Sequence, residues 1–506
     1  MRKSSVAKPP PRGFEGLVRE RLAAEIGAIG KQAPFTVALA YPSPYATAMS
    51  SLGYQRIYRA IMETPGMACE RVFLDDEAER DITVQGRPLT YESLRPMEEL
   101  PVIAFSVAYE IELTGVVQML DSANVPALRE ERSERHPFVL AGGPLTFSNP
   151  LPLAAFADAI VMGEAEQVVI EVLRTLEDVS GRAAQLAALA RIPHVHVPAV
   201  HGAILPEGAK ADSALLPAWA PIRTPHTVLS DMFLIETERG CSRTCTYCVM
   251  RRSTNGGMRL VPMETILGLV PADAKRVGLV GAAVSDHPRV AQIVSTLAEQ
   301  GRQVGLSSLR PDRLNDDLVG ALRRAGHRSL TTAMDGASER MRELLERRAR
   351  PKHLLRCAEL ARKHGMDRLK LYLMVGLPGE TDADIDECVT FVAELSNVVP
   401  IALGIAPFIS KRNTPLDGQP FAGIDVVSAR LARLRRGLRG RADVRATSSR
   451  WAWVEYVLAQ GAEAEGRAVA EAVRAGGGFA AFKRAFDRLE KEAPARPRRS
   501  LAIAPF

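Results

Sequence analysis

Residues 236–252, ETERGCSRTCTYCVMRR, hold three of the six cysteines of this 506-residue chain within eight positions. Cys241, Cys245 and Cys248 suit a disulfide framework, a metal site or a group of small apolar side chains. Three cysteines leave one unpaired, and so few cysteines without an apolar leader segment are typical of a reducing cytosol. A structural zinc ion takes four ligands, and no fourth Cys or His lies near in sequence.

Three thiolates in one loop can instead hold three irons of a cubane iron-sulfur cluster, which leaves the fourth iron open to another ligand. Cys357 and Cys388 lie on predicted helices among Leu and Ala residues, where buried free thiols are expected. The spacing CxxxCxxC therefore predicts a cluster with one open iron.

The sequence around this loop alternates short β-rich runs with amphipathic helical runs. Six such units predict a curved parallel sheet or partial barrel, with its active site at the C-terminal strand ends. The predicted strands are 233–240, 276–284, 303–309, 328–334, 368–376 and 399–408. The predicted helices are 263–274, 288–300, 315–325, 338–365 and 381–396.

Five segments are expected along the chain. An earlier α/β unit is predicted from strands at 35–41, 101–107, 137–143 and 158–164. Residues 1–33 are expected to form a basic tail, disordered up to residue 12, followed by a helix. The first α/β domain is expected at 34–178 and a proline-rich linker at 179–229. The barrel is expected at 230–415 and a helical region at 416–506.

The net charge of +6 is concentrated in runs such as 430–445 and 496–500. Nucleic acid is one interpretation of these runs, but solvated helix faces are their commoner origin, and no aromatic residues interleave to stack on bases. No apolar run is long enough to span a membrane. A cytoplasmic protein without membrane contact is expected.

The cysteine loop and the units behind it resemble the radical S-adenosylmethionine (SAM) superfamily, in which an aromatic residue stands before the third cysteine, as Tyr247 does here. The resemblance implies a [4Fe-4S] cluster whose open iron binds SAM, on a partial (β/α)6 barrel. It also implies SAM contacts at strand ends, although "LVGAAVSDH" lacks the family's usual Gly-Gly-Glu. The implied SAM residues are Tyr247, Gly281, Ser285, Ser308, Arg310, Asp335, Gly376, Leu377 and Pro378.

The first domain is similar to the flavodoxin-like, Rossmann-type domain of the cobalamin-binding class of this superfamily. The similarity rests on "AYPSPYATAMSSLGYQRIYRAI", "ERVFLDD", "IAFSVAYEIELTGVVQMLDSANVP" and "VLAGGPLTFSNPLPLAAFADAIVMGEAEQVV". Small residues at strand ends allow close backbone approach to a corrinoid. The implied cobalamin residues are Ser43, Tyr45, Leu52, Gly53, Ser106, Gly142, Gly143, Gly163 and Glu164.

The first domain departs from cobalamin domains that ligate cobalt with histidine, because no histidine precedes His136. Bound cobalamin would lack a histidine lower ligand from the loop after the first strand. The same absence fits a vestigial cobalamin domain.

The resemblance implies reductive cleavage of SAM to a 5'-deoxyadenosyl radical, with cobalamin for methylation of an unactivated carbon and a reductase, flavodoxin or ferredoxin as electron donor. Methylthiolation of RNA or a ribosomal protein is an alternative, disfavoured because the first domain offers only Cys69 for a second cluster. A non-enzymatic cobalamin sensor is another, but it would not need the cysteine loop. Neither the substrate nor the catalytic residues can be identified from the sequence.

Overall fold

A computed structural model describes residues 13–76, 87–250, 257–306 and 309–492. Residues 1–12, which are predicted to be disordered, lie outside these ranges. The basic stretch 496–500 and Ser308 also lie outside them. None of the described helices combines the length and apolar character needed to cross a membrane.

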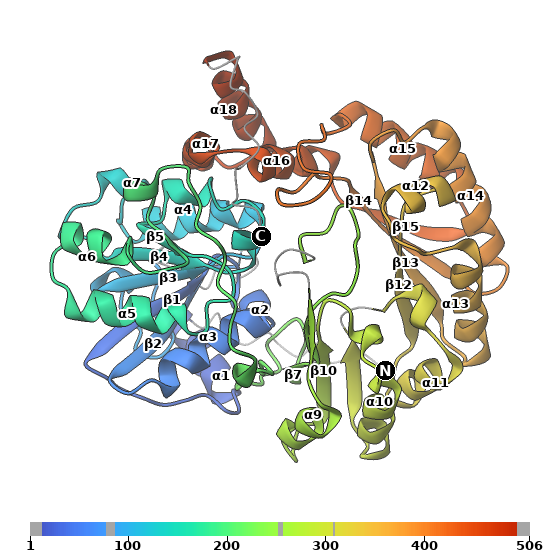
Figure 1. Ribbon diagram of the computed structural model, residues 1–506, viewed down its shortest axis with the longest axis horizontal. Coiled ribbons are helices and arrows are strands. Elements are labelled where there is room, and N and C mark those ends of the chain that lie inside the picture. The colour runs from blue at the N-terminus through green and yellow to red at the C-terminus, as the bar shows by residue number, and fades with distance from the viewer. Residues whose placement is uncertain (1–12, 77–86, 251–256, 307–308, 493–506) are drawn as a thin grey trace, which may run out of the picture.

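The N-terminal unit is a six-stranded sheet with strand order β2-β1-β3-β4-β5-β6, parallel except for the antiparallel β6 (Figure 1). The four strands predicted for residues 34–178 are confirmed, and the sheet also contains β2 and β6. The strands are β1 (Phe35–Tyr41), β2 (Met67–Phe73), β3 (Val102–Ser106), β4 (Phe138–Gly142), β5 (Ala159–Val161) and β6 (Val195–His196).

Helices cover both faces of this sheet. One face packs on α3 and α5, and the other on α4 and on helices from the far C-terminus. The helices of this unit are α1 (Phe14–Ala23), α2 (Tyr45–Ala48), α3 (Leu52–Glu63), α4 (Leu113–Ser122), α5 (Val168–Asp178), α6 (Arg182–Leu189) and α7 (Pro198–His201).

The expected linker is therefore partly structured. Residues 179–229 contribute α6, α7 and the edge strand β6, which pairs Val195 with Val161 and His196 with Ile160 of β5. Four apolar residues of this segment, Leu189, Val195, Val197 and Ile222, are buried in the core of the first domain.

The second unit carries seven parallel strands in two sheets, ordered β11-β10-β7 and β12-β13-β14-β15. No pairing joins β11 to β12 in the part of the chain that the structure describes. The strands are β7 (Met232–Glu236), β10 (Arg276–Val280), β11 (Gln303–Leu306), β12 (Ser329–Asp335), β13 (Arg368–Val375), β14 (Ile401–Pro407) and β15 (Ala442–Ala446). A short antiparallel pair, β8 (Glu238–Gly240) and β9 (Met258–Leu260), flanks the cysteine loop.

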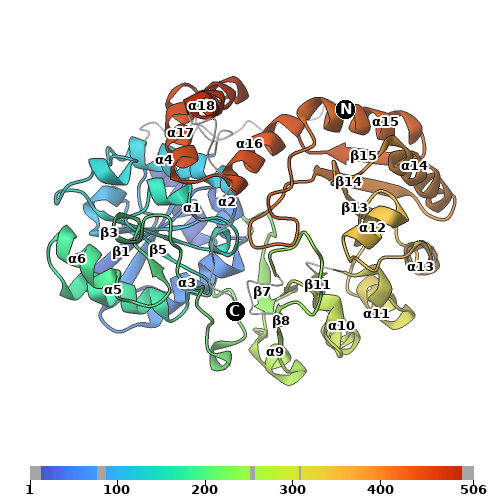
Figure 2. The same ribbon diagram turned by 45° about the horizontal axis from the view of Figure 1, so that its top comes forward.

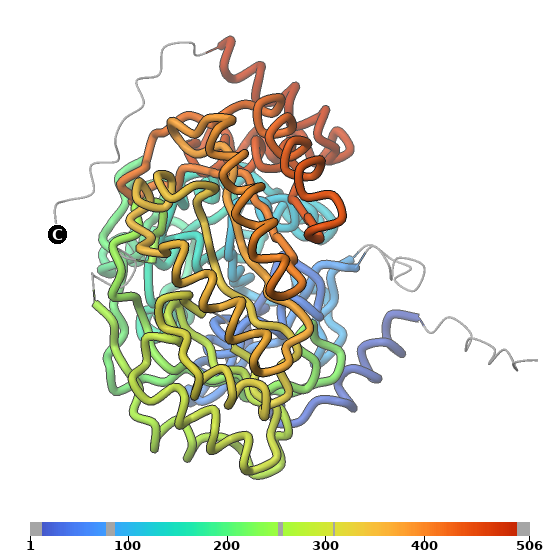
Figure 3. The backbone as a smooth tube through the Cα atoms, turned by 90° about the vertical axis from the view of Figure 1, so that its right-hand side faces the viewer, coloured from blue at the N-terminus to red at the C-terminus, as the bar shows by residue number. Residues whose placement is uncertain are grey.

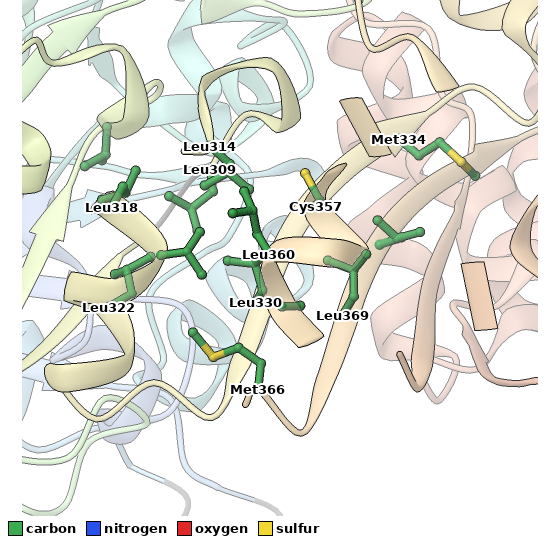
Figure 4. Close-up of a cluster of buried hydrophobic side chains, with 14 of the residues drawn as sticks. Leu309, Leu314, Leu318, Leu322, Leu330, Met334, Cys357, Leu360, Met366 and Leu369 are labelled. Atoms are coloured by element: carbon green, nitrogen blue, oxygen red, sulfur yellow. The ribbon is translucent and has the colours of Figure 1, made fainter. Parts of the chain in front are cut away.

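The helices of this unit lie on its outer side and bury one core beneath both sheets (Figure 3). Figure 4 shows Cys357 within that core among leucine side chains, and Cys357 and Cys388 are both fully buried, as predicted. The helices are α9 (Met263–Leu269), α10 (Val290–Glu299), α11 (Asp316–Arg324), α12 (Glu339–Leu344), α13 (Pro351–Lys363), α14 (Asp382–Ser396) and α15 (Ile424–Gly437).

The expected helical region 416–506 is wrong as a separate unit. Its α15 and β15 extend the second unit, because β15 pairs with β14 and α15 packs into the same core. The remaining helices α16 (Ser449–Gln460), α17 (Glu463–Arg474) and α18 (Phe479–Glu492) pack beside α4 on the first domain (Figure 2). The C-terminal helices thus join the two units.

Candidate functional site

The cysteine loop begins where β8 ends, at Gly240, whose φ of +95° suits glycine. Cys245 is buried, Cys241 and Cys248 are half-buried, and none forms a disulfide. Burial raises the pKa of all three thiols, that of Cys248 to about 11, and charges on Cys245 and Cys241 contribute to that rise. The three thiols therefore lie near enough to influence one another.

This donor set fits a cubane cluster. The described residues contain no group of three or more His, Cys, Asp or Glu side chains placed to hold a single metal ion. The three thiolates of a cubane bind three different irons, so they need not converge on one point. Cys241, Cys245 and Cys248 are free thiols on one loop and can supply three such ligands.

Tyr247 and Asp335, both predicted to contact SAM, contact each other. The Tyr247 hydroxyl donates to Asp335 Oδ2 over 3.0 Å, and Arg347 Nε lies 2.5 Å from the same oxygen. Arg347 Nη1 lies 4.0 Å from Cys245 Sγ. Asp335 has a φ of +62° at the end of β12, a left-handed conformation that its contacts hold in place.

Arg347 was missed from the sequence. Burial is the largest influence on its pKa and lowers it, but Asp335, Tyr247 and Cys245 together raise the pKa overall, so the guanidinium is charged. A charged donor beside a cluster thiolate stabilises negative charge on the cluster. Asp335 therefore positions Arg347 and Tyr247 around the cluster loop, and this occupies the carboxylate oxygen predicted to accept from SAM.

Gly281, at the end of β10, lies against the carboxylate of Glu238. A Cβ on Gly281 would come within 1.9 Å of Glu238 Oε1. The same oxygen accepts from the Ala283 N–H over 2.8 Å, and burial raises the pKa of Glu238 to about 7. The segment LVGAAVSDH lacks the family's Gly-Gly-Glu, but the Glu238 carboxylate of β8 lies beside it. The sequence did not indicate this contact.

Ser285 and Arg310 also come together. The Ser285 hydroxyl accepts from the Arg310 N–H over 2.9 Å. The Arg310 guanidinium, predicted to hold a SAM carboxylate, is buried and forms ion pairs with Asp286 and Asp312. Its charge is therefore already paired in this structure.

The Gly376 turn lies at the end of β13, with φ of +85°, and its N–H donates to Glu380 Oε2 over 2.7 Å. Leu377 packs in a small apolar cluster that Tyr247 also contacts. Pro378 is half-buried. A pocket opens beside Tyr247, with walls that include Met374, Ala406, Phe408 and Trp451.

A second cavity, of about 290 Å³ and open to solvent, lies over the C-terminal ends of β1, β3, β4 and β5. Six of the nine predicted cobalamin residues line it, namely Gly53, Ser106, Gly142, Gly143, Gly163 and Glu164. Glu236, Arg239 and Met250 of the second unit also line it. The cavity thus reaches from the predicted cobalamin site to the cysteine loop.

The other three predicted cobalamin residues lie outside the lining of this cavity. The Ser43 hydroxyl donates to Glu112 Oε1 over 3.1 Å. Tyr45 is 1% exposed and stacks on Tyr91 within the core. Burial of its aromatic ring stabilises the fold more than exposure at the sheet edge would. Leu52, the first residue of α3, is half-buried.

Glu164 serves as part of a charged contact between the two units. Arg239 lies 3.2 Å from Glu164, 2.7 Å from Glu166 and 2.7 Å from Glu236. Arg259 lies 2.5 Å from Glu164. Since β8 contains Arg239 and leads into Cys241, this network ties the cluster loop to the first domain.

Two family models match this chain. The model "Radical SAM superfamily" matches residues 235–392, and "Radical SAM proteins, N-terminal" matches residues 53–198. The chain belongs to the radical SAM superfamily.

Individual relatives are more distant. The uncharacterized protein MJ0966 of Methanocaldococcus jannaschii is 28% identical over 290 residues, 56% of this chain and 62% of that protein. The ribosomal protein uS12 methylthiotransferase RimO of Desulfosudis oleivorans is 27% identical over 184 residues, 33% of this chain and 41% of RimO. The chain thus matches less than two thirds of either relative.

Among solved structures, the cobalamin-dependent SAM radical enzyme OxsB, in its apo form, aligns with a TM-score of 0.50 and 11% identity, over 80% of this chain and 55% of OxsB. This likeness shows a shared fold.

Proposed function

We propose that this protein cleaves SAM reductively at a [4Fe-4S] cluster held by Cys241, Cys245 and Cys248, and uses cobalamin to methylate an unactivated carbon. The observation that carries the proposal is the cavity that joins the cobalamin-like sheet edge to the strand leading into the cysteine loop. Two cofactors that act on one substrate must be bound next to the same space, and the cavity supplies that space.

Cys241, Cys245 and Cys248 would hold the cluster, which when bound would supply the electron for reductive cleavage of SAM, and bound cobalamin would supply the methyl group. Tyr247 and Leu377 line the apolar region where the adenosine part of SAM would pack. Glu238, beside Gly281, offers a carboxylate to the SAM amino group. A flavodoxin, ferredoxin or reductase would deliver the electron.

The cobalamin cavity is tested by filling it at Gly53, an exposed α3 residue with nothing within 4 Å of its Cβ position. The wild type, incubated anaerobically with hydroxocobalamin and desalted, should retain stoichiometric corrinoid by its visible absorption. Gly53→Trp should retain little, because the indole projects from a wall of the cavity.

Gly268 provides the matched control, since it is an exposed helical glycine with the same free space and lies away from the cavity. Gly268→Trp should retain corrinoid like the wild type. No corrinoid in the wild type would contradict the cobalamin part and leave a radical enzyme with a vestigial domain. Equal retention by both variants would contradict the placement of cobalamin in this cavity.

Methylthiolation is the second candidate, because several curated relatives carry that name. The cysteine content of the first domain argues against a second cluster there. Cys69 is 1% exposed inside the core, and it is the first domain's single cysteine. Methylation is therefore preferred.

A further inference from the structure

The cobalamin cavity contains a buried arginine. Arg56, on α3, is 7% exposed and lines the cavity. Its Nε is buried without a hydrogen-bond partner among the residues that the structure describes. Such a group is costly to bury unless a ligand supplies the missing negative charge.

The acidic residues of the cavity wall do not supply that charge. Glu164, Glu166 and Glu236 are each in an ion pair with Arg239, and Glu164 also pairs with Arg259. None of these carboxylates is within ion-pair distance of Arg56 in the described residues. Arg56 is therefore available to a ligand.

A second cation stands next to Arg56 on the same helix. Arg59 is 6% exposed, stacks over the Trp219 ring at 3.9 Å and lies 3.7 Å from Glu63. Burial and the neighbouring Arg56 charge lower the pKa of Arg59 to about 10. Arg59 does not line the cavity, so Arg56 is the arginine of α3 that faces it.

A phosphate group suits this arrangement, because the planar guanidinium donates two parallel hydrogen bonds to phosphate oxygens. The remaining lining is glycine, serine and apolar side chains, apart from the charges already paired. We infer that Arg56 binds the phosphodiester of a nucleotide-bearing corrinoid, so that this site selects cobalamin over a corrinoid without its nucleotide tail. The inference rests on the proposed function.

The test compares hydroxocobalamin with cobinamide, which has the corrin ring but lacks the nucleotide and its phosphate. Both are titrated into the anaerobic full-length protein by absorption or calorimetry. The wild type should bind cobalamin more tightly. Arg56→Met should lose about ten- to hundredfold in cobalamin affinity, the range of a charge-assisted hydrogen bond, and change little for cobinamide.

Arg59→Met is the matched control, since it removes a neighbouring buried arginine outside the cavity. It should keep the wild-type ratio of the two affinities. Without ligand, Arg56→Met should unfold at the wild-type temperature or above, because a buried charge is removed. If Arg56→Met does not fold, Arg56→Gln is titrated in its place, with the same expected loss of preference.

Equal wild-type affinities for the two corrinoids, or an Arg56→Met variant that weakens both equally, would overturn the inference and leave the cobalamin proposal intact. Failure of the wild type to bind either corrinoid would overturn both. The two failures are therefore distinguishable.

Discussion

At the residue scale, Arg347 is the side chain whose position is most informative about the cluster, since it lies between Asp335 and Cys245. A positive charge near the thiolate favours the reduced cluster. Arg347→Met should therefore shift the midpoint potential of the reconstituted cluster to a more negative value, measured by redox titration with electron paramagnetic resonance.

Arg328→Met removes the same charge from an exposed side chain and should leave the midpoint potential unchanged. Iron and sulfide contents must match the wild type in both variants. An unchanged potential in a fully loaded Arg347→Met protein would show that the contact has no influence on the cluster.

The sequence revealed part of this arrangement. The cysteine spacing and Tyr247 are local features, visible in eight consecutive positions. Arg347 lies 102 residues after Cys245, in the charged run RRAR, which is typical of a solvated surface. The turn that brings it back is set by tertiary packing, so the pattern alone could not predict its role.

At the element scale, the approach of β8 to the end of β10 depends on Gly281. Gly281→Ala should lower stability to chemical denaturation by about 1–3 kcal/mol, because its Cβ would overlap the Glu238 carboxylate. The exposed Gly268→Ala should instead be neutral or stabilising by roughly 0.5–1 kcal/mol.

A double variant distinguishes this overlap from a general effect of alanine. Combined with Glu238→Ala, Gly281→Ala should cost less than it does alone, since the clashing group is gone. Additive losses would contradict the proposed contact.

Two strands, β2 and β15, were not predicted from the sequence, and each was missed for a physical reason. Strand β2 contains Glu70 and Arg71, which argue against a buried strand, yet Arg71 is 1% exposed because Glu25 and Glu92 pair with it. Strand β15 is a short edge strand with exposed Asp443 and Arg445, which are typical of a surface. Predicted strands such as 35–41 are nearly continuous apolar runs, and others such as 368–376 alternate apolar with polar residues. Both patterns are local and need no distant partner to be recognised.

At the scale of the whole molecule, the two units are held together by contacts far apart in sequence. Lys411, after β14, lies 2.7 Å from Glu110 of the first domain and 2.8 Å from Glu455 of α16. The Asn149 side chain donates to backbone carbonyls at the end of α16. An amphipathic pattern shows that α16–α18 have a buried face and does not show which surface covers it.

The central claim is that the three cysteines hold the cluster that cleaves SAM. The most direct test is 5'-deoxyadenosine, measured by mass spectrometry after anaerobic reconstitution with iron and sulfide and incubation with SAM and dithionite. The wild type and Cys388→Ala, which removes a buried cysteine remote from the loop, should form it, whereas Cys245→Ala should lose iron and form none. A wild type with full iron content that forms no 5'-deoxyadenosine would contradict the account.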